Sequence, residues 1–360
     1  MKINRREFIK DTVIVSSTVG LTSAFGSSAD ASFLGLGRKD NSPGNPKKAN
    51  FRFVHMADQH VFDKRQGTEG YKVCIQSVRA LRPKPNFVLM GGDMVFDGCY
   101  NTKEDYLRWL KQTREISDQL HCRWYPCMGN HDPFGLSPRR KCDPNDPDIG
   151  KQLIMTEFRW PSQKSYYSFD YEGWHFAVLD TTYQVDTESG ASQEAKIGSE
   201  QMEWLGKDLG QAGDRPKIVV MHVAVFYIKP LADANPEAKA IAAGMMVSDC
   251  KDLRLLLERH QVKAVLQGHC HHIEGCLYNG VHYLTSASAS GAWWSGDWVG
   301  GLPGYTLFHC KGTQMSWKHL SYPWEPRLED ADTLERERQA TYDAEKVEQE
   351  RQLTKERGLL

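Results

Sequence analysis

Short apolar runs alternate with stretches of helical periodicity in the chain that follows residue 50. Residues 51–57, 86–90 and 124–128 have the length and apolar content of buried strands. Residues 71–81 and 103–120, which lie between these runs, place apolar side chains at the spacing of a helix. This order of strand, helix, strand, helix and strand predicts a layered α/β sheet.

The remainder of the pattern predicts further elements of the same kind. Residues 166–171 and 174–180 flank Glu172-Gly173 and are typical of a β-hairpin. Two helices are expected at 199–209, with Ser199 as the N-cap, and at 248–260. The other expected strands are 217–221, 263–267, 281–286, 305–309 and 314–319.

Length and charge limit the classes of protein that this chain can represent. Its 360 residues suit one large catalytic domain or two small ones. A net charge of −1 and a pI of about 6.9 do not favour binding of nucleic acid polymers or anionic membranes through bulk charge. Recognition of phosphate would therefore depend on local groups.

The first 31 residues are typical of an export signal. Residues 4–10 (Asn-Arg-Arg-Glu-Phe-Ile-Lys) resemble the twin-arginine motif, residues 12–25 are mildly apolar, and Ala29-Asp30-Ala31 matches a cleavage site. The apolar stretch is too short and too polar for a membrane span, so we expect none in the mature protein. We expect the twin-arginine translocation machinery to export the folded chain, which would be periplasmic or extracellular. Cleavage of the signal and its retention as a tether both stay open.

These signals divide the chain into four parts. We expect a signal peptide at 1–31, a linker at 32–50, one catalytic domain at 51–322, and a charged, solvated helical tail at 323–360. The nine cysteines are an odd number, so at least one thiol would stay unpaired in an oxidising compartment. Most of them are expected to be buried as small hydrophobic residues.

Five polar fragments follow apolar runs, at positions where a strand would end and a loop begin. They are Asp58-Gln59-His60, Gly92-Asp93, Gly129-Asn130-His131-Asp132, Met221-His222 and Gly268-His269-Cys270-His271. Ligands from several strand ends can meet at one point, which is where α/β folds place their chemistry. Each fragment alone is a weak signal, but the ordered set predicts one dinuclear metal site.

The residue types in these fragments indicate which metals would bind. Asp58 and His60 are two residues apart at a strand exit, and Asp93 follows two glycines that let the backbone bend towards an ion. A carboxylate at Asp93 could bridge two cations held about 3.5–4 Å apart. Together with amide and imidazole ligands, it favours Mn, Fe, Zn or Co over Ca and copper(I).

The ordered set resembles the calcineurin-like metallophosphoesterase family over residues 51–320. The resemblance implies an α/β (α+β) fold, a four-layer αββα sandwich of two mixed β-sheets flanked by helices. It also implies two divalent or trivalent transition-metal ions, one bound by Asp58, His60, Asp93 and His271 and the other by Asp93, Asn130, His222 and His269. In overall plan the chain is most similar to bacterial cyclic-nucleotide phosphodiesterase-like members. Phe96 stands where purple acid phosphatases have a tyrosine ligand.

The resemblance implies a metal-dependent phosphoesterase acting on a small-molecule phosphate ester, with diesters favoured over monoesters. A metal-bridging hydroxide would attack phosphorus in line with the leaving oxygen. His131 is the candidate for protonating the leaving group, with Asp132 orienting its imidazole or serving as a turn residue. One alternative is a phosphomonoesterase or pyrophosphatase on nucleotides, sugar phosphates or lipid head groups. Another is a non-catalytic metal-holding binding module, and the oligomeric state is left open.

Other polar residues near these motifs have two interpretations each. Arg139 and Arg140 could clamp a phosphate or belong to a solvated loop. His272 and Asp97 could support the site or be ordinary structural residues. Cys270 is expected to point away from the metals, because alternate residues of an extended segment face opposite ways.

Three tryptophans follow the last ligand motif in a run of small residues. Trp293, Trp294 and Trp298 could form a wall for part of the substrate, or they could pack in the core.

Overall fold

The computed structural model describes residues 44–229, 244–296, 302–328, 330 and 332–333. The predicted signal peptide and most of the predicted tail lie outside the described residues. Residues 46–48 of the predicted linker form a short 3-10 helix, Pro46–Lys48, that leads into the first strand. Within the described ranges, no helix is long and apolar enough to cross a membrane.

The first sheet has five strands in the order β13-β12-β1-β2-β3. Its members are β1 (Asn50–Met56), β2 (Phe87–Met90), β3 (Arg123–Pro126), β12 (Gly304–Lys311) and β13 (Gln314–Ser321). Strands β1, β2 and β3 are parallel, whereas β12 is antiparallel to both β1 and β13. The sheet is therefore mixed, with its parallel strands on one side.

The second sheet has six strands in the order β10-β11-β9-β8-β5-β4. Its members are β4 (Tyr167–Tyr171), β5 (Trp174–Val178), β8 (Lys217–Val220), β9 (Ala264–Gln267), β10 (Glu274–Tyr278) and β11 (Val281–Thr285). The central strands β5, β8, β9 and β11 are parallel, and antiparallel hairpins close both edges. This sheet is also mixed.

Aromatic side chains fill the space between the two sheets. Phe53 of β1 stacks on Phe87 of β2 with ring centroids 5.1 Å apart. The same Phe53 ring meets Phe176 of β5 edge-on at 5.6 Å, across the gap between the sheets. All three rings are buried, so the sheets are joined by a continuous aromatic core.

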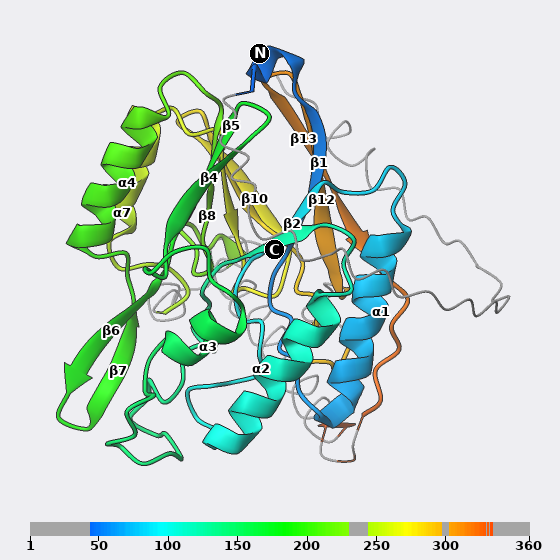
Figure 1. Cartoon of the computed structure of the whole chain (residues 1–360), viewed down its shortest axis with the longest axis vertical. Coiled ribbons are helices and arrows are strands. Elements are labelled where there is room, and N and C mark those ends of the chain that lie inside the picture. The colour runs from blue at the N-terminus through cyan, green and yellow to red at the C-terminus, as the bar shows by residue number, and fades with distance from the viewer. Residues whose placement is uncertain (1–43, 230–243, 297–301, 329, 331, 334–360) are drawn as a thin grey trace, which may run out of the picture. The chain divides into compact units, whose positions relative to one another are not determined.

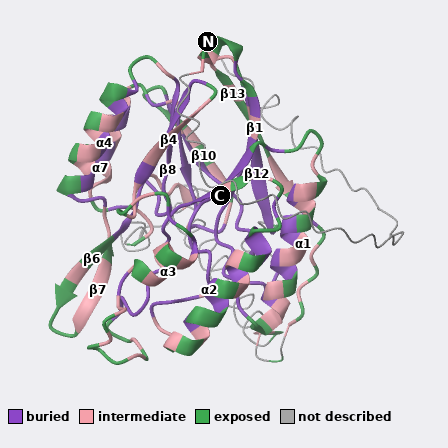
Figure 2. Ribbon diagram, viewed as in Figure 1, coloured by how far each residue is buried: buried purple, intermediate pink, exposed green. Residues whose placement is uncertain are grey.

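Helices cover the outer face of each sheet (Figure 1). Helices α1 (Gly67–Ala80) and α2 (Lys103–Ser117) pack on the first sheet, and α4 (Ser199–Gln211) and α7 (Cys250–Arg259) pack on the second. Successive residues of β8 contact opposite layers. Ile218 and Val220 face the aromatic core, while Val219 faces α4 and α7. In Figure 2 central strands such as β1 and β8 are mainly purple, whereas the helices mix purple with pink and green. The predicted four-layer αββα sandwich is confirmed.

The structure adds elements that the apolar pattern did not predict. These are α3 (Gln152–Glu157), the edge strand β10, the 3-10 helix Lys64–Gln66, and a two-stranded hairpin of β6 (Thr182–Thr187) and β7 (Gly190–Ala195). The expected cap of α4 was wrong by one residue, since Gly198 is the N-cap and Ser199 already lies in the helix. All nine cysteines are free thiols, and five of them are buried.

Candidate metal centre

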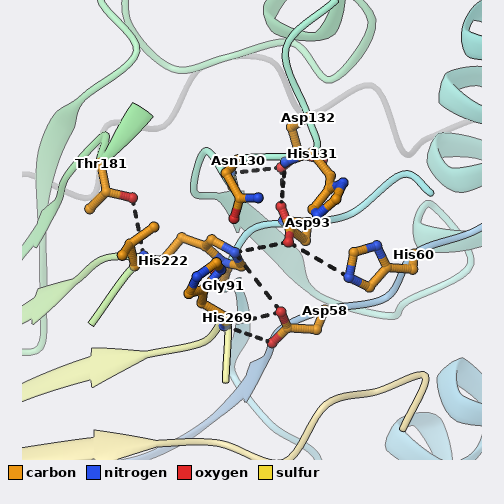
Figure 3. A network of polar contacts seen from close by, with 12 residues as sticks. Asp58, His60, Gly91, Asp93, Asn130, His131, Asp132, Thr181, His222 and His269 are labelled. Atoms are coloured by element: carbon orange, nitrogen blue, oxygen red, sulfur yellow. Dashed lines mark hydrogen bonds and ion pairs between the residues drawn. The ribbon is translucent and has the colours of Figure 1, made fainter. Parts of the chain in front are cut away.

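Six candidate metal ligands meet beyond the carboxyl ends of the parallel strands, in two groups of three. The first group contains Asp58, His60 and His271, and the second contains Asp93, His222 and His269. Within each group the ligand atoms lie within 4.8 Å of one another, and all six residues except His269 are buried. Figure 3 shows side chains of both groups converging from separate strand ends.

The carboxylate of Asp93 lies between the two groups. Its Oδ2 is 3.0 Å from Nε2 of His222 and 3.6 Å from Nε2 of His60, which belong to different groups. Oδ1 of Asp58 is 3.5 Å from Nε2 of His271 and 3.9 Å from Nε2 of His222. Asp93 therefore has the position expected of a carboxylate that bridges two cations.

Backbone carbonyls orient the imidazoles. For three histidines, Nδ1 bonds a carbonyl oxygen and leaves Nε2 for the site: His60 bonds Phe96 at 3.1 Å, His222 bonds Gly91 at 2.8 Å, and His271 bonds Gly291 at 2.5 Å. His269 is reversed, because its Nε2 bonds the carbonyl of Gly244 at 3.0 Å and leaves Nδ1. A bond of this kind fixes the tautomer and the ring plane of a ligating histidine.

Five of the six residues have a left-handed backbone. Their φ angles are 57° for Asp58, 42° for His60, 52° for Asp93, 71° for His269 and 58° for His271. Such angles are uncommon outside glycine and cost about 1–3 kcal/mol each. Strain of this kind gathers at functional sites, where the surrounding structure holds it in place.

Two glycines allow the ligand loops to touch. A Cβ on Gly129 would lie 2.0 Å from the backbone nitrogen of Asp93, and a Cβ on Gly92 would lie 2.5 Å from Nδ1 of His222. Gly92 also has a φ of +93°, which side-chain-bearing residues rarely adopt. The sequence Gly-Gly-Asp and Gly-Asn-His-Asp therefore brings three loops into direct contact.

Several buried polar atoms of this centre lack a hydrogen-bond partner among the described residues. They include Nε2 of His222, Oδ1 of Asn130 and Nδ1 of His131, the last of which is 3.5 Å from Oδ1 of Asp97. Oδ2 of Asp93 is close to that Nε2, at 3.0 Å, but not in hydrogen-bond geometry. Buried polar atoms are normally paired, so these lone pairs call for another partner. The carboxylate and imidazole donors at these distances fit transition-metal ions, and the unpaired Oδ1 of Asn130 is a further oxygen donor.

Burial and mutual charge set the protonation of the centre. Burial lowers the pKa of His269 to about 3 and that of His271 to about 4, and it also holds the pKa of His60 well below its usual range. Burial raises the pKa of Asp58 to about 7. The three histidines are therefore neutral at neutral pH, which is the form that binds metals.

His222 differs from the other imidazoles. Burial would lower its pKa, but the carboxylates of Asp93 and Asp58 outweigh burial and raise it to about 9. For the Asp93 carboxyl, burial alone would raise the pKa. The facing imidazoles of His222 and His131 outweigh burial and hold this pKa well below its usual range. The centre thus favours a positive charge beside Asp93, as a cation there would supply.

His131 lies at the edge of the centre and is half-buried. Its ring centroid is 5.2 Å from that of His60, and its Nδ1 is 3.5 Å from Oδ1 of Asp97. Burial would lower its pKa, but the carboxylates of Asp93 and Asp97 raise it to about 9. Asp97 is therefore the carboxylate that lies beside this imidazole.

Asp132 has a different position from the one expected. Its carboxylate accepts hydrogen bonds from the backbone N–H groups of Asp93, Met94 and Gly129, at 2.8–2.9 Å, and from Val95 at 3.2 Å. The prediction that Asp132 orients His131 was wrong in this respect, because its oxygens are bonded to these amides. Asp132 instead holds the loop that carries Asp93, as a buried turn residue.

Comparison with known proteins agrees with this geometry. The family model described as calcineurin-like phosphoesterase matches residues 51–272, more than half of the chain. The chain belongs to the calcineurin-like phosphoesterase family. The matched range contains all seven predicted ligands of this phosphoesterase.

Three curated relatives of this phosphoesterase are named as enzymes that act on phosphate esters. A probable glycerophosphodiester phosphodiesterase of Arcobacter nitrofigilis is 25% identical over 256 residues, covering 66% of this chain and 78% of the relative. A 3',5'-cyclic-nucleotide phosphodiesterase of Nostoc is 25% identical, covering 61% and 69%. A serine/threonine-protein phosphatase of Danio rerio is 27% identical, covering 60% and 64%.

A solved structure supports the fold of this phosphoesterase. The purple acid phosphatase of yellow lupin seeds superposes with a TM-score of 0.52 at 15% identity, covering 78% of this chain and 53% of the lupin chain. This chain thus spans about half of that protein, and the likeness concerns the fold alone. Phe96 here stacks on Phe62 with ring centroids 4.1 Å apart, so its side chain is part of the packing.

The remaining predicted residues of this phosphoesterase lie outside the two groups. Arg140 donates to the carbonyls of Gly135, Ser189 and Ala191, so its guanidinium fixes loops instead of facing the ligands. The guanidinium of Arg139 lies over the Tyr100 ring at 5.2 Å.

His272 and Cys270 flank His271 but belong to neither ligand group. His272 bonds the carboxylate of Glu274 through Nε2. Cys270 is buried, and burial raises its pKa well above the usual range for a thiol. Neither residue has a ligand position.

Two supporting residues had no signal in the sequence. Nε2 of Gln193, on β7, donates to the carbonyl of Asn130 at 2.5 Å, so the β6–β7 hairpin touches the ligand loop. Oγ1 of Thr181 accepts from the N–H of Val223 at 3.1 Å and holds the chain after His222 (Figure 3). Both act through backbone groups of distant loops, which a linear motif does not show.

Proposed function

We propose that this chain is a metal-dependent phosphodiesterase that acts outside the cytoplasm. The activity rests on one observation, the pair of buried ligand groups that share the Asp93 carboxylate. Such a pair fits two-metal hydrolysis of a phosphate ester, and the family is described as a phosphoesterase family. The proposed ligands are Asp58, His60, Asp93 and His271 for one ion, and Asp93, Asn130, His222 and His269 for the other.

Side chains of this protein would hold the two ions in fixed positions relative to the substrate. Two bound transition-metal ions would supply an activated water as the nucleophile and neutralise charge on the phosphoryl oxygens. Asp93 and the carbonyl-bonded imidazoles fix the ligand atoms in advance, so little reorganisation accompanies binding. The metals are proposed as Mn, Fe, Zn or Co, because hard oxygen and imidazole donors are mixed.

His131 is proposed to donate a proton to the leaving oxygen. Its imidazole lies beside His60 and faces Asp97, which favours the protonated form. Asp97 would hold the ring by its Nδ1, leaving Nε2 for the leaving group. In this assignment Asp97 takes the orienting role that we expected of Asp132 from the sequence.

Two of the relatives support cleavage of diesters. They are named as a probable glycerophosphodiester phosphodiesterase and a cyclic-nucleotide phosphodiesterase, whereas the third is named as a protein phosphatase. A phosphomonoesterase is the alternative that the third relative favours.

Hydrolysis of two chromogenic esters tests this proposal. The purified protein is loaded in turn with Mn, Fe, Zn or Co and assayed with bis(p-nitrophenyl) phosphate and p-nitrophenyl phosphate. Faster diester cleavage that Asp93→Asn abolishes is expected. Faster monoester cleavage would move the function to a phosphatase, and the absence of turnover with both metals bound would favour a binding module.

The proposed location rests on the twin-arginine motif at residues 4–10. Replacing Arg5 and Arg6 by lysine keeps the charge of this segment and removes the paired guanidinium groups. The doubly substituted chain should accumulate in the cytoplasm while the native chain reaches the periplasm, as cell fractionation would measure. Equal export of both chains would refute the twin-arginine route.

A further inference from the structure

A segment after β11 is bonded to every member of the first ligand group. Oγ of Ser290 donates to the carbonyl of Asp58 at 2.8 Å, and Oγ of Ser288 donates to the same oxygen at 3.1 Å. Nε1 of Trp294 donates to the carbonyl of His60 at 3.0 Å. The carbonyl of Gly291 accepts from Nδ1 of His271. The segment from Ser288 to Gly296 is therefore fixed relative to this group.

The two tryptophans of this segment have different surroundings. Trp294 is fully buried and meets the ring of Trp324 edge-on at 5.8 Å, so it packs in the core. Trp293 is half-buried, and its ring centroid is 4.3 Å from that of His271 and 5.6 Å from that of His60. Trp298 lies outside the described residues. Of the two interpretations drawn from the sequence, core packing fits Trp294 and the substrate wall fits Trp293.

The backbone is strained at both tryptophans. Trp293 has a φ of 48° and Trp294 a φ of 68°, and left-handed angles are outliers for side chains this large. The guanidinium of Arg65 donates to the carbonyl of Trp293 at 3.0 Å and helps to hold this conformation. Consecutive strained residues persist where the surrounding structure imposes them, and they cluster at ligand sites.

We propose that Trp293 forms an aromatic subsite that stacks on a planar group of the substrate, a nucleobase or an aryl ring. This inference rests on the proposed function and names the substrate class for it. The indole of Trp293 lies beside the proposed ligands of one metal ion, and indole rings stack on planar groups. His131 also flanks His60, so the planar group would lie near the leaving oxygen.

A planar partner fits this arrangement better than a quaternary ammonium group. Recognition of an ammonium group generally uses a cage of several aromatic rings. The indole of Trp293 contacts both His60 and His271, and one ring suffices for stacking.

Binding of two ligands that differ only by a base tests the subsite. The full-length, metal-loaded protein is titrated calorimetrically with adenosine 5'-monophosphate and with ribose 5-phosphate, which lacks the adenine. We expect the nucleotide to bind about tenfold more tightly, from the worth of one stacked base. Trp293→Leu should abolish that ratio, and Trp293→Phe should retain most of it, since both variants carry the same backbone strain.

Matched controls separate stacking from damage to the site. Trp317→Leu removes an exposed tryptophan on β13 and should leave the binding ratio unchanged. Metal content and the melting temperature of Trp293→Leu should match the wild type, and Trp293→Phe serves if the leucine variant does not fold. An unchanged nucleotide preference in Trp293→Leu, or equal binding of both ligands by the wild type, would overturn the subsite. Preference for phosphocholine over both sugar phosphates, lost in Trp293→Leu, would also overturn it.

Failure of the Trp293 subsite can be distinguished from failure of the proposed phosphodiesterase function. If the wild type hydrolyses diesters and Trp293→Leu raises KM equally for planar and non-planar esters, the function stands and the subsite fails. If Trp293 confers nucleotide preference but no ester is hydrolysed, the subsite stands and the catalytic proposal fails.

Discussion

The hydrogen bonds of individual histidines determine which nitrogen each can offer to a metal. Three of them bond carbonyls through Nδ1, and His269 bonds one through Nε2. Each bond selects a tautomer before any ion arrives, which lowers the reorganisation that metal binding requires. The carbonyls come from loops far from the histidines in sequence, so ring orientation is a product of the fold.

The first prediction concerns His131. Replacement by alanine should leave metal content intact and lower kcat by about 10²- to 10⁴-fold, because proton donation is lost while the ligands stay in place. Metal analysis and steady-state kinetics on the same preparation would measure both. His272→Ala is the matched control, since that imidazole bonds Glu274 outside the ligand groups. An unchanged kcat in His131→Ala would remove this residue from the mechanism.

The second prediction separates Asp132 from Asp97. Asp132→Ala removes the acceptor for four buried backbone amides and should lower the free energy of unfolding by about 3 kcal/mol or more. Asp97→Asn should instead leave stability close to wild type and lower kcat. Denaturant unfolding and kinetics would test the pair, with exposed Asp186→Ala as a neutral control. The reverse pattern would restore the sequence-based role of Asp132.

The candidate ligands were predictable from sequence, and their supports were not. Asp58, Asp93 and His222 each break an apolar run at a strand end, which is a local signal. The role of Asp132 could not be read in this way, because three of its four partners are backbone amides of a loop 37–39 residues away. The contact between Trp293 and His271 is likewise a tertiary feature.

Among the strands, some were predictable from the sequence and others were not. The core strands were predictable, since they are short apolar runs buried on both faces. The hairpin of β6 and β7 was missed because its residues are mostly exposed or half-buried and show no apolar alternation. Its position depends on Arg140, which donates to the carbonyls of Ser189 and Ala191. No local sequence pattern predicts those long-range bonds.

The third prediction concerns this hairpin. Gln193→Leu removes the bond from β7 to the carbonyl of Asn130 and should lower kcat several-fold, with little change in melting temperature. Gln184, its exposed cross-strand partner on β6, provides the control substitution Gln184→Leu. Equal kinetics for the two variants would show that the hairpin does not position the Asn130 loop.

At the scale of the whole molecule, the centre joins the two sheets and makes stability depend on metal. Ligands come from the ends of β1 and β2 in one sheet and of β8 and β9 in the other. An ion that binds only the folded state at 100 times its Kd contributes about 2.7 kcal/mol. Chelation should therefore lower the melting temperature by roughly 5 °C, and added Mn or Zn should restore it. Asp93→Asn should show no such metal dependence, and an equal shift in that variant would contradict a centre built on Asp93.

The last prediction concerns stability in acid. His319 on β13 bonds Oγ1 of Thr306 at 2.8 Å, and burial lowers its pKa from 6.5 to about 4. The unfolded chain therefore binds this proton first as pH falls from 6.5 towards 4, so protonation favours unfolding over that range. The loss is on the order of 2–3 kcal/mol. His319→Gln should consequently show a shallower fall of melting temperature between pH 6.5 and 4, whatever its baseline at pH 8. Identical slopes for the two proteins would mean that this half-buried imidazole does not control acid stability.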